Sequence, residues 1–327
     1  MELHQLEAFA AVMSAGSVTG AARLLGRSQP GVSRMIQDLE HEIGYPLFDR
    51  NGPRVTPTQR AFLLYEEVER MLLGLDRIRE SALAIGRDEA PPLRIAATPA
   101  LAAALVARAL ATLEADGVGQ DAQVRSASAE QVVQAVLSRA ADAGIATLPL
   151  DHAALHLHYV IEAPCVAVLS RADPLAGAPI VRLRDLAERR LATVANRHRL
   201  RRRIDQAFTA ARVEANVVLE SNASLNAVMA AHEGLAVAVV DPATAFGTPV
   251  ADVAVRPLDV HIPFLYGVVT ASGRPPSPAV DALIDAIDRV SHALLPGAAR
   301  HRPAQHDALL SGKSGSRAPR KPVGAAA

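Results

Sequence analysis

The sequence predicts a composite fold, all-α at the N-terminus and α/β in the larger C-terminal part, with one long helix between them. Residues 18–43 contain two short amphipathic segments around a tight turn, the pattern of a helix-turn-helix. Residues 58–87 carry apolar side chains at alternating spacings of three and four, which is typical of a long helix with one apolar seam. From residue 93 onward, short apolar segments alternate with helical ones, which indicates a mainly parallel sheet. A chain of 327 residues has room for both parts.

The N-terminal part, residues 1–57, is predicted to be a winged helix-turn-helix. The turn falls at Gly26-Arg27. Ser28 can cap the helix that follows, and Pro30 is tolerated in its first turn because those N–H groups have no partner inside the helix. The apolar side chains that would form the buried stripe of this helix are Val32, Ile36, Leu39 and Ile43.

Two further elements complete this part. A helix is predicted over residues 2–14, ahead of the helix-turn-helix. Residues 48–57 are predicted to form the wing, a hairpin of two short strands. Asn51-Gly52 is its turn signal, because this dipeptide accepts the left-handed backbone that a two-residue hairpin turn requires.

The helix that begins after Ser28 would present a polar face opposite its buried stripe. That face carries Gln29, Ser33, Arg34 and Gln37. Short polar side chains and an arginine near the start of a helix suit the base edges of a DNA major groove. The simpler alternative is an ordinary helical hairpin whose polar face is only solvated.

The whole segment resembles the N-terminal domain of LysR-type transcriptional regulators. The matching residues run without gaps and are Leu6, Phe9, Val12, Gly16, Ser17, Ala21, Ala22, Leu24, Gln29, Pro30, Val32, Ser33, Ile36, Leu39, Glu40, Gly44, Leu47, Phe48, Arg50, Thr56 and Pro57. The resemblance implies base and backbone contacts from the start of the recognition helix and from the wing. With Gln37 from the polar face, the predicted DNA-binding residues are Gln29, Pro30, Ser33, Arg34, Gln37, Arg50 and Arg54.

The charge of this part is balanced, which is unusual for a DNA-binding domain. Residues 1–60 hold six arginines and six acidic residues, and the formal net charge of the whole chain is zero. Non-specific affinity for DNA should therefore be modest, because it scales with the number of phosphates that cations contact.

The long helix is predicted to open with Thr56 as its cap, Pro57 in its first position and Gln59 completing a capping box. Its seam consists of Ala61, Leu64, Val68, Met71, Leu75, Ile78, Ala82 and Ile85. The seam could belong to the core of the next domain. We prefer a contact between two chains, because charged residues surround it, and the resemblance implies the same dimerisation role for residues 58–87.

Residues 88–296 are predicted to form the α/β domain. The predicted strands are 93–98, 122–126, 143–148, 158–170, 191–195, 215–221, 235–241, 253–258 and 263–271, and the predicted helices are 99–115, 129–140, 183–190, 201–212, 223–233 and 277–295. This order resembles the effector-binding domain of the same family. The resemblance implies a periplasmic-binding-protein-like fold, with a ligand between subdomain I (88–163 and 267–296) and subdomain II (164–266).

Polar residues stand where strands of this domain give way to helices. The predicted effector-binding residues are Thr98, Ser126, Ser128, Asn196, Ser221 and Asn222. Free N–H groups at helix starts favour carboxylates, and open α/β sheets bind ligands at the carboxyl ends of their strands. The simpler alternative for each residue is that it only caps a helix.

The ligand class rests on a second resemblance. Residues 66–78, 235–245 and 255–264 look like the subgroup of lysine-biosynthesis and opine-catabolism regulators, which implies an amino-acid-derived or carboxylate effector. Its amine would then pair with an acid such as Glu220 or Asp241.

The last segment, residues 297–327, has no apolar period and carries six basic residues against one acid, so we expect a disordered basic tail. The single cysteine, Cys165, excludes an internal disulfide, and its apolar neighbours favour a buried structural thiol. No secretory signal and no apolar run of membrane-spanning length is found, so we expect a cytoplasmic protein.

The sequence favours no enzyme. It contains no nucleophile elbow and no dinucleotide fingerprint, and SGKSGS at residues 311–316 lacks the glycine and the strand that a phosphate loop needs. His152, His156 and His158 have no cysteine or carboxylate cluster beside them, so we expect no metal, no cofactor and no catalytic residue.

The function expected is that of a DNA-binding transcriptional regulator controlled by a small effector. Its expected partners are double-stranded promoter or operator DNA, the effector, and further copies of the chain in a homodimer or homotetramer, with RNA polymerase as a further candidate and no membrane. The alternative is a solute-binding protein of a transport system that uses the same effector fold.

Overall fold

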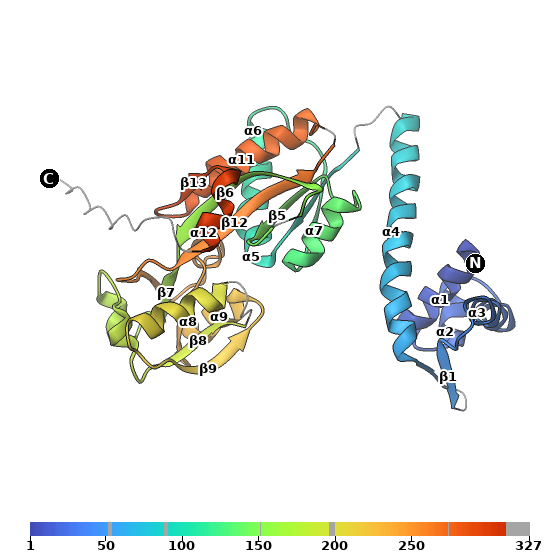
Figure 1. Cartoon of the computed structure of the whole chain (residues 1–327), viewed down its shortest axis with the longest axis horizontal. Coiled ribbons are helices and arrows are strands. Elements are labelled where there is room, and N and C mark those ends of the chain that lie inside the picture. Colours follow the sequence, from blue (N-terminus) through green and yellow to red (C-terminus); the bar gives the residue numbers. More distant parts are fainter. Residues whose placement is uncertain (52–53, 88–90, 151, 196–199, 274, 312–327) are drawn as a thin grey trace. The chain divides into compact units, whose positions relative to one another are not determined.

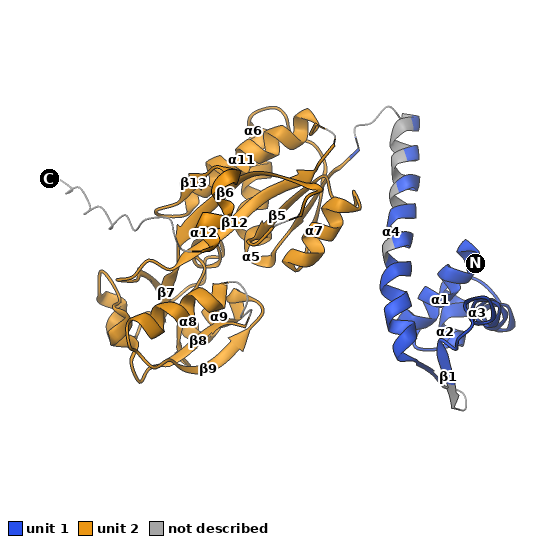
Figure 2. Ribbon diagram, in the orientation of Figure 1, with its two compact units in different colours: residues 1–91 blue, residues 92–327 orange. Residues whose placement is uncertain are grey.

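The computed structural model describes residues 1–51, 54–87, 91–150, 152–195, 200–273 and 275–311. The chain divides into two compact units, residues 1–91 and residues 92–327 (Figure 2), and each is described by itself.

The first unit contains the predicted helix-turn-helix. Its elements are α1 (Leu3–Ala15), α2 (Val18–Leu24), α3 (Gln29–Ile43), β1 (Phe48–Asn51), β2 (Arg54–Pro57) and α4 (Gln59–Arg87). Ser28 caps α3 as predicted, because its hydroxyl accepts from the N–H of Gly31 at 3.3 Å. Gly26 takes the left-handed backbone (φ +62°) that the tight turn requires. Val32, Ile36 and Leu39 are buried, so the predicted stripe of α3 faces the core.

Two boundaries in this unit differ from the prediction. Asn51 pairs with Arg54, so Asn51 belongs to strand β1 and not to the turn; residues 52–53 lie outside the described residues. Thr56 and Pro57 belong to β2, and α4 begins only at Gln59. The cap of α4 is Thr58, whose hydroxyl accepts from the N–H of Ala61 at 3.2 Å. The antiparallel pairing of β2 with β1 outweighs the local helix-start signal.

The apolar seam of α4 is buried near its start and exposed further along the helix. Ala61 and Val68 are buried in the core of their own unit, where α4 packs against α1. Met71 and Ile78, in contrast, are 41% and 65% exposed. The prediction that the whole seam joins two chains is therefore wrong for its first two turns. The part of the seam that is accessible to a second chain begins at Met71.

The second unit is built on two sheets (Figure 1). The six-stranded sheet has the order β13 (Ala299–His301), β6 (Leu155–Pro164), β12 (Pro263–Ala271), β5 (Ala143–Thr147), β3 (Leu93–Ala97), β4 (Ala122–Ser126). The five-stranded sheet has the order β11 (Val253–Pro257), β7 (Val166–Ser170), β10 (Val237–Val240), β8 (Arg190–Val194), β9 (Asn216–Ser221). The helices around them are α5 (Pro99–Leu101), a π-helical turn (Ala102–Val106), α6 (Ala107–Ala115), α7 (Ala129–Leu137), α8 (Leu200–Ala210), α9 (Ser224–His232), α10 (Pro242–Gly247) and α11 (Pro278–Leu294).

Both sheets are mixed, and not mainly parallel as predicted. β3 runs parallel to β4 and β5, and β8 runs parallel to β9 and β10. The strands that join the two sheets reverse this direction, because β12 is antiparallel to β5 and β6, and β7 is antiparallel to β10 and β11. Periodicity along single segments carries no information on this pairing direction.

The chain crosses between the sheets twice, at Cys165 and at residues 258–262. The second crossing comes earlier than predicted. β12 begins at Pro263 and pairs with β6 along its whole length, so residues 263–266 belong to subdomain I and not to subdomain II. The predicted boundary fell inside this strand because its apolar run has no internal break.

Helix α10, which the sequence analysis missed, packs against the π-helical turn after α5 and also contacts α9. Gly247 ends this helix beside Ala104, and a Cβ on Gly247 would lie only 2.2 Å from the Cβ of Ala104. Glycine is therefore required at this position by a close approach between elements attached to different sheets.

The predicted disorder of the C-terminal segment is wrong for residues 299–311. β13 adds a strand to the edge of β6, and a short helix, α12 (His306–Leu310), follows it. Leu309 is buried in the core on the α7 side of the six-stranded sheet. One edge strand and one apolar side chain order this segment, and neither makes a periodic pattern; residues 312–327 lie outside the described residues.

Candidate DNA-reading face and effector site

The first candidate site is the polar face of α3. Gln29, Pro30, Arg34 and Gln37 are exposed, and Ser33 is half-buried beside them. The side chain of Arg34 is 84% exposed, and its Nε lies 4.0 Å from the carboxylate of Asp38. An exposed ion pair of this length binds weakly, so the guanidinium remains accessible to an incoming anion.

The two wing arginines lie on the hairpin, but their side chains fall outside the described residues. Arg50 pairs with Val55, and Arg54 pairs with Asn51. The backbone therefore carries both arginines on paired strands next to the turn.

The second candidate site begins at the carboxyl edge of the six-stranded sheet. Thr98 follows β3 and precedes the helical run 99–115. It is 8% exposed, and its hydroxyl oxygen is buried without a hydrogen-bond partner. A buried polar atom in this state is costly, and its position where helical N–H groups begin suits an anionic ligand.

Ser126 and Ser128 lie on the neighbouring strand end. Ser126 is paired with Ala97 and is exposed. The hydroxyl of Ser128 accepts from the N–H of Gln131 at 3.3 Å, and the Gln131 side chain accepts from the Ser128 N–H at 3.0 Å. Ser128 thus caps α7, which was the simpler alternative to an effector-binding role.

The remaining predicted residues lie at the edge of the five-stranded sheet. Ser221 ends β9, and its hydroxyl accepts from the N–H of Ala223 and the side chain of Asn226 at 3.1 and 2.9 Å. Asn222 is exposed, and Asn196 lies outside the described residues. No hydrogen bond or ion pair among the described residues joins this group to the group around Thr98.

The two acids expected to bind a ligand amine are already engaged. Asp241 is buried and caps α10, accepting from the N–H and hydroxyl of Thr244 at 2.7 and 3.2 Å, and from Ser224. Burial raises the pKa of the Asp241 carboxyl. Glu220 lies 2.8 Å from the guanidinium of Arg201. Both acids therefore stabilise the fold, which the sequence pattern could not distinguish from a free carboxylate.

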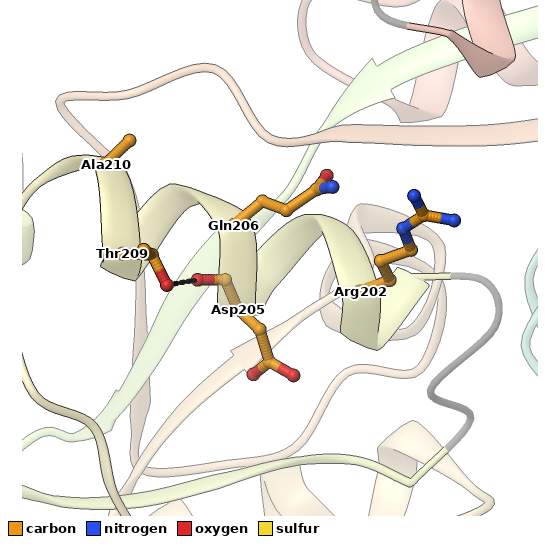
Figure 3. Close-up of a pocket in the computed structure, with 5 residues that line it drawn as sticks. All are labelled: Arg202, Asp205, Gln206, Thr209 and Ala210. Carbon is orange, nitrogen blue, oxygen red and sulfur yellow. Dashed lines mark hydrogen bonds between the residues drawn. The ribbon is translucent and has the colours of Figure 1, made fainter.

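A groove of about 390 Å³ runs along the outer face of α8 (Figure 3), and no predicted effector residue lines it. Its lining residues are Arg202, Asp205, Gln206, Thr209 and Ala210. All belong to one helix, so this is a helix face and not an enclosed site.

The histidines and the cysteine do not form a metal site in the described ranges, where no group of three ligand-type side chains is arranged to hold a metal ion. The rings of His156 and His158 meet edge to face, and His158 Nε2 bonds the hydroxyl of Thr270 at 2.9 Å. Cys165 is buried, and burial raises the pKa of its thiol, as expected for an unreactive structural cysteine. No helix of the described residues is long and apolar enough to span a membrane.

Two family models match the chain. Residues 3–61 match the bacterial regulatory helix-turn-helix protein of the lysR family, and residues 86–291 match the LysR substrate binding domain. The solved structure of CbnR, a LysR family transcriptional regulator, has a TM-score of 0.73 at 19% identity and covers 89% of this chain and 99% of its own, which shows that the folds are alike.

Three characterised relatives match almost end to end. The regulatory protein NocR of Agrobacterium fabrum is 32% identical over 291 residues, covering 88% of this chain and 97% of the relative. The octopine catabolism/uptake operon regulatory protein OccR of Rhizobium meliloti is 31% identical, covering 90% and 98%. The transcriptional activator protein LysR of Escherichia coli is 28% identical, covering 86% and 91%.

These matches agree with the geometry of both units, and none of them favours a transport protein or an enzyme. The chain belongs to the LysR family of bacterial transcriptional regulators, with a helix-turn-helix DNA-binding domain followed by an effector-binding domain.

Proposed function

We propose that this regulator acts in the cytoplasm, binds its operator as a homodimer or homotetramer, and senses a small amino-acid-derived carboxylate. One relative supports the ligand class, because its name assigns it to an octopine catabolism and uptake operon. RNA polymerase is the further partner expected of a regulator bound at a promoter.

Operator recognition is assigned to the exposed face of α3 and to the wing. The residues proposed to contact DNA are Gln29, Pro30, Ser33, Arg34, Gln37, Arg50 and Arg54. The observation that supports this assignment is the division of α3 into a buried stripe and an exposed polar face. A gel shift with the DNA upstream of the chain's own gene tests it, and failure to retard that DNA in preference to unrelated DNA would contradict it.

Effector recognition is assigned to the strand ends. The residues proposed are Thr98, Ser126, Ser128, Asn196, Ser221 and Asn222. The observation that supports this assignment is the buried, unpartnered hydroxyl of Thr98. A carboxylate held there would satisfy this hydroxyl and the first N–H groups of the helical run 99–115.

The test is a thermal-shift screen of amino acids, diamino acids and opine-like conjugates. A ligand of the folded state raises the melting temperature by mass action. Thr98→Val removes the hydroxyl at nearly constant volume, so it should abolish the shift. The melting temperature of the ligand-free protein should not fall, because the hydroxyl makes no bond in it. If Thr98→Val, Ser128→Ala and Ser221→Ala all bind a discovered ligand normally, the assignment is wrong.

A further inference from the structure

The segment that follows α11 runs beside the hinge of the effector-binding domain. A turn closed by the hydrogen bond from the Ala298 N–H to the Leu295 carbonyl, at 3.1 Å, reverses the chain after the helix. Gly297 takes the left-handed backbone (φ +73°) in this turn, and a Cβ on Gly297 would lie 3.5 Å from the ring of Pro164. The segment therefore meets the end of β6 next to Cys165, the first crossing between the sheets.

Strand β13 then contacts β6 through its backbone and through one side chain. His301 pairs with Val160, and its Nε2 lies 2.8 Å from one carboxylate oxygen of Glu162. The other oxygen of Glu162 lies 2.7 Å from Nε2 of His261, which belongs to the second crossing, residues 258–262. The Glu162 side chain is only 17% exposed, so water screens these contacts less than it screens a surface ion pair. One carboxylate thus joins the C-terminal strand to the second crossing.

The two crossings are also bonded to each other, because the Cys165 N–H donates to the carbonyl of Ile262 at 2.9 Å. A change in the angle between the subdomains has to be taken up by the backbone dihedral angles of these short segments, since the chain passes between the sheets there. A side-chain link from the second crossing to β6 and β13 therefore resists rotation of one subdomain against the other.

We propose that residues 297–301, which we name the C-terminal clamp, restrain the hinge between the two subdomains through the contact of His301 with Glu162. The clamp holds the Glu162 carboxylate in the position from which it binds His261. Release of His301 leaves this carboxylate with one partner on the second crossing, so both crossings open more often. The restraint acts in the ligand-free protein and does not depend on the identity of the effector.

The chain carries its own probe of this motion. Cys165 is its single cysteine, and the side chain is 1% exposed in a core cluster that contains residues of both sheets. A thiol reagent in solution modifies Cys165 only when the first crossing opens or when the protein unfolds. The rate of labelling under native conditions therefore measures how often the crossing opens.

The experiment compares this labelling rate between the parent protein and three variants. His301→Ala should label at least tenfold faster than the parent protein. His301→Gln should label near the parent rate, because glutamine keeps an N–H that can donate to Glu162. Leu309→Ala is the matched control: Leu309 anchors the same C-terminal segment, but in a core cluster that contains no residue of either crossing. Leu309→Ala should lower the melting temperature more than His301→Ala does, and should change the labelling rate less.

Two truncations extend the comparison. Truncation after Pro296 removes the whole clamp and should label at least as fast as His301→Ala, whereas truncation after Ser311 should label at the parent rate. Equal labelling of His301→Ala and the parent protein overturns the proposal. So does a labelling rate that follows the melting temperature across all variants, because Cys165 would then be reached by global unfolding and the clamp would be only structural. If His301→Ala does not fold, Glu162→Gln weakens the same contact from its other side and should label faster in its place.

Discussion

The guanidinium of Arg300 on β13 lies over the aromatic ring of Tyr159 on β6, 4.4 Å from the ring centroid. The same guanidinium is 2.7 Å from the carboxylate of Asp288 on α11, and the Tyr159 hydroxyl donates to the carbonyl of Ile284 on that helix at 2.7 Å. Three elements are joined through these two side chains. The match to the family model for the effector domain ends at residue 291, before β13 begins.

Truncation after Pro296 should therefore destabilise the effector domain. It removes β13, the cation over Tyr159 and the buried side chain of Leu309. Loss of one buried leucine costs about 1.5–3 kcal/mol, which lowers the melting temperature of a domain of this size by roughly 5 °C or more. Truncation after Ser311 is the control and should melt near the parent protein. Equal melting of all three proteins would show that the added strand contributes nothing.

Glu162 should make the stability of this region dependent on pH. Its hydrogen bond to His261 is the largest cause that holds the pKa of the Glu162 carboxyl below its usual value, and His301 adds to it. A carboxyl with a lowered pKa stabilises the folded state above its unfolded pKa, and this contribution disappears as the pH falls through the folded pKa. Glu162→Gln should thus melt below the parent protein at about pH 7, with the difference vanishing toward about pH 3. A gap that stays constant over this range would contradict the ion-pair explanation.

Arg34→Ala and Gln29→Ala should each weaken specific operator binding by about 1–3 kcal/mol, the usual contribution of one base contact. Both side chains are exposed on α3, so folding should be unaffected. The matched control is His41→Ala, an exposed residue at the far end of the same helix. Titrations of operator and unrelated DNA by fluorescence anisotropy separate specific from non-specific loss. Unchanged operator affinity in both variants would remove the assignment of this face.

Met71→Glu with Ile78→Glu should give a folded monomer with little affinity for operator DNA. Both side chains are exposed on α4, so the introduced carboxylates should not disturb the fold of the single chain. They should disrupt the proposed contact between two α4 helices. Val68→Glu is a different experiment, because Val68 is buried and a charge there should unfold the first unit. Sedimentation velocity gives the assembly state and circular dichroism gives the fold. An unchanged assembly in the double variant would place the dimer contact elsewhere.

Most of the secondary structure could be predicted from the sequence, because the longer helices of the second unit show a helical period and are flanked by strands. The helices over 129–140, 201–212 and 277–295 are confirmed with shifts of a few residues at their ends. The short elements were not predicted. Helix α10 has only six residues and β13 only three, too few for a period to be recognised.

The candidate sites were predicted less evenly. The exposed face of α3 follows directly from its buried stripe, because residues of a surface helix that do not lie on the buried stripe face solvent. For Ser128 and Asp241, the sequence shows a polar residue at a strand end but not whether its hydrogen bonds are already made. Their partners Gln131 and Thr244 are local, and both residues cap helices in the structure.

The contact between Gly247 and Ala104 restricts how the effector domain can move. The two elements already touch at the distance of a bare backbone, so they cannot slide closer, and the helix that carries Gly247 is attached to one sheet while Ala104 is attached to the other. A motion of the subdomains that keeps this contact must therefore pivot at it. A side chain at position 247 would instead force the two elements apart, because its Cβ would lie 2.2 Å from the Cβ of Ala104.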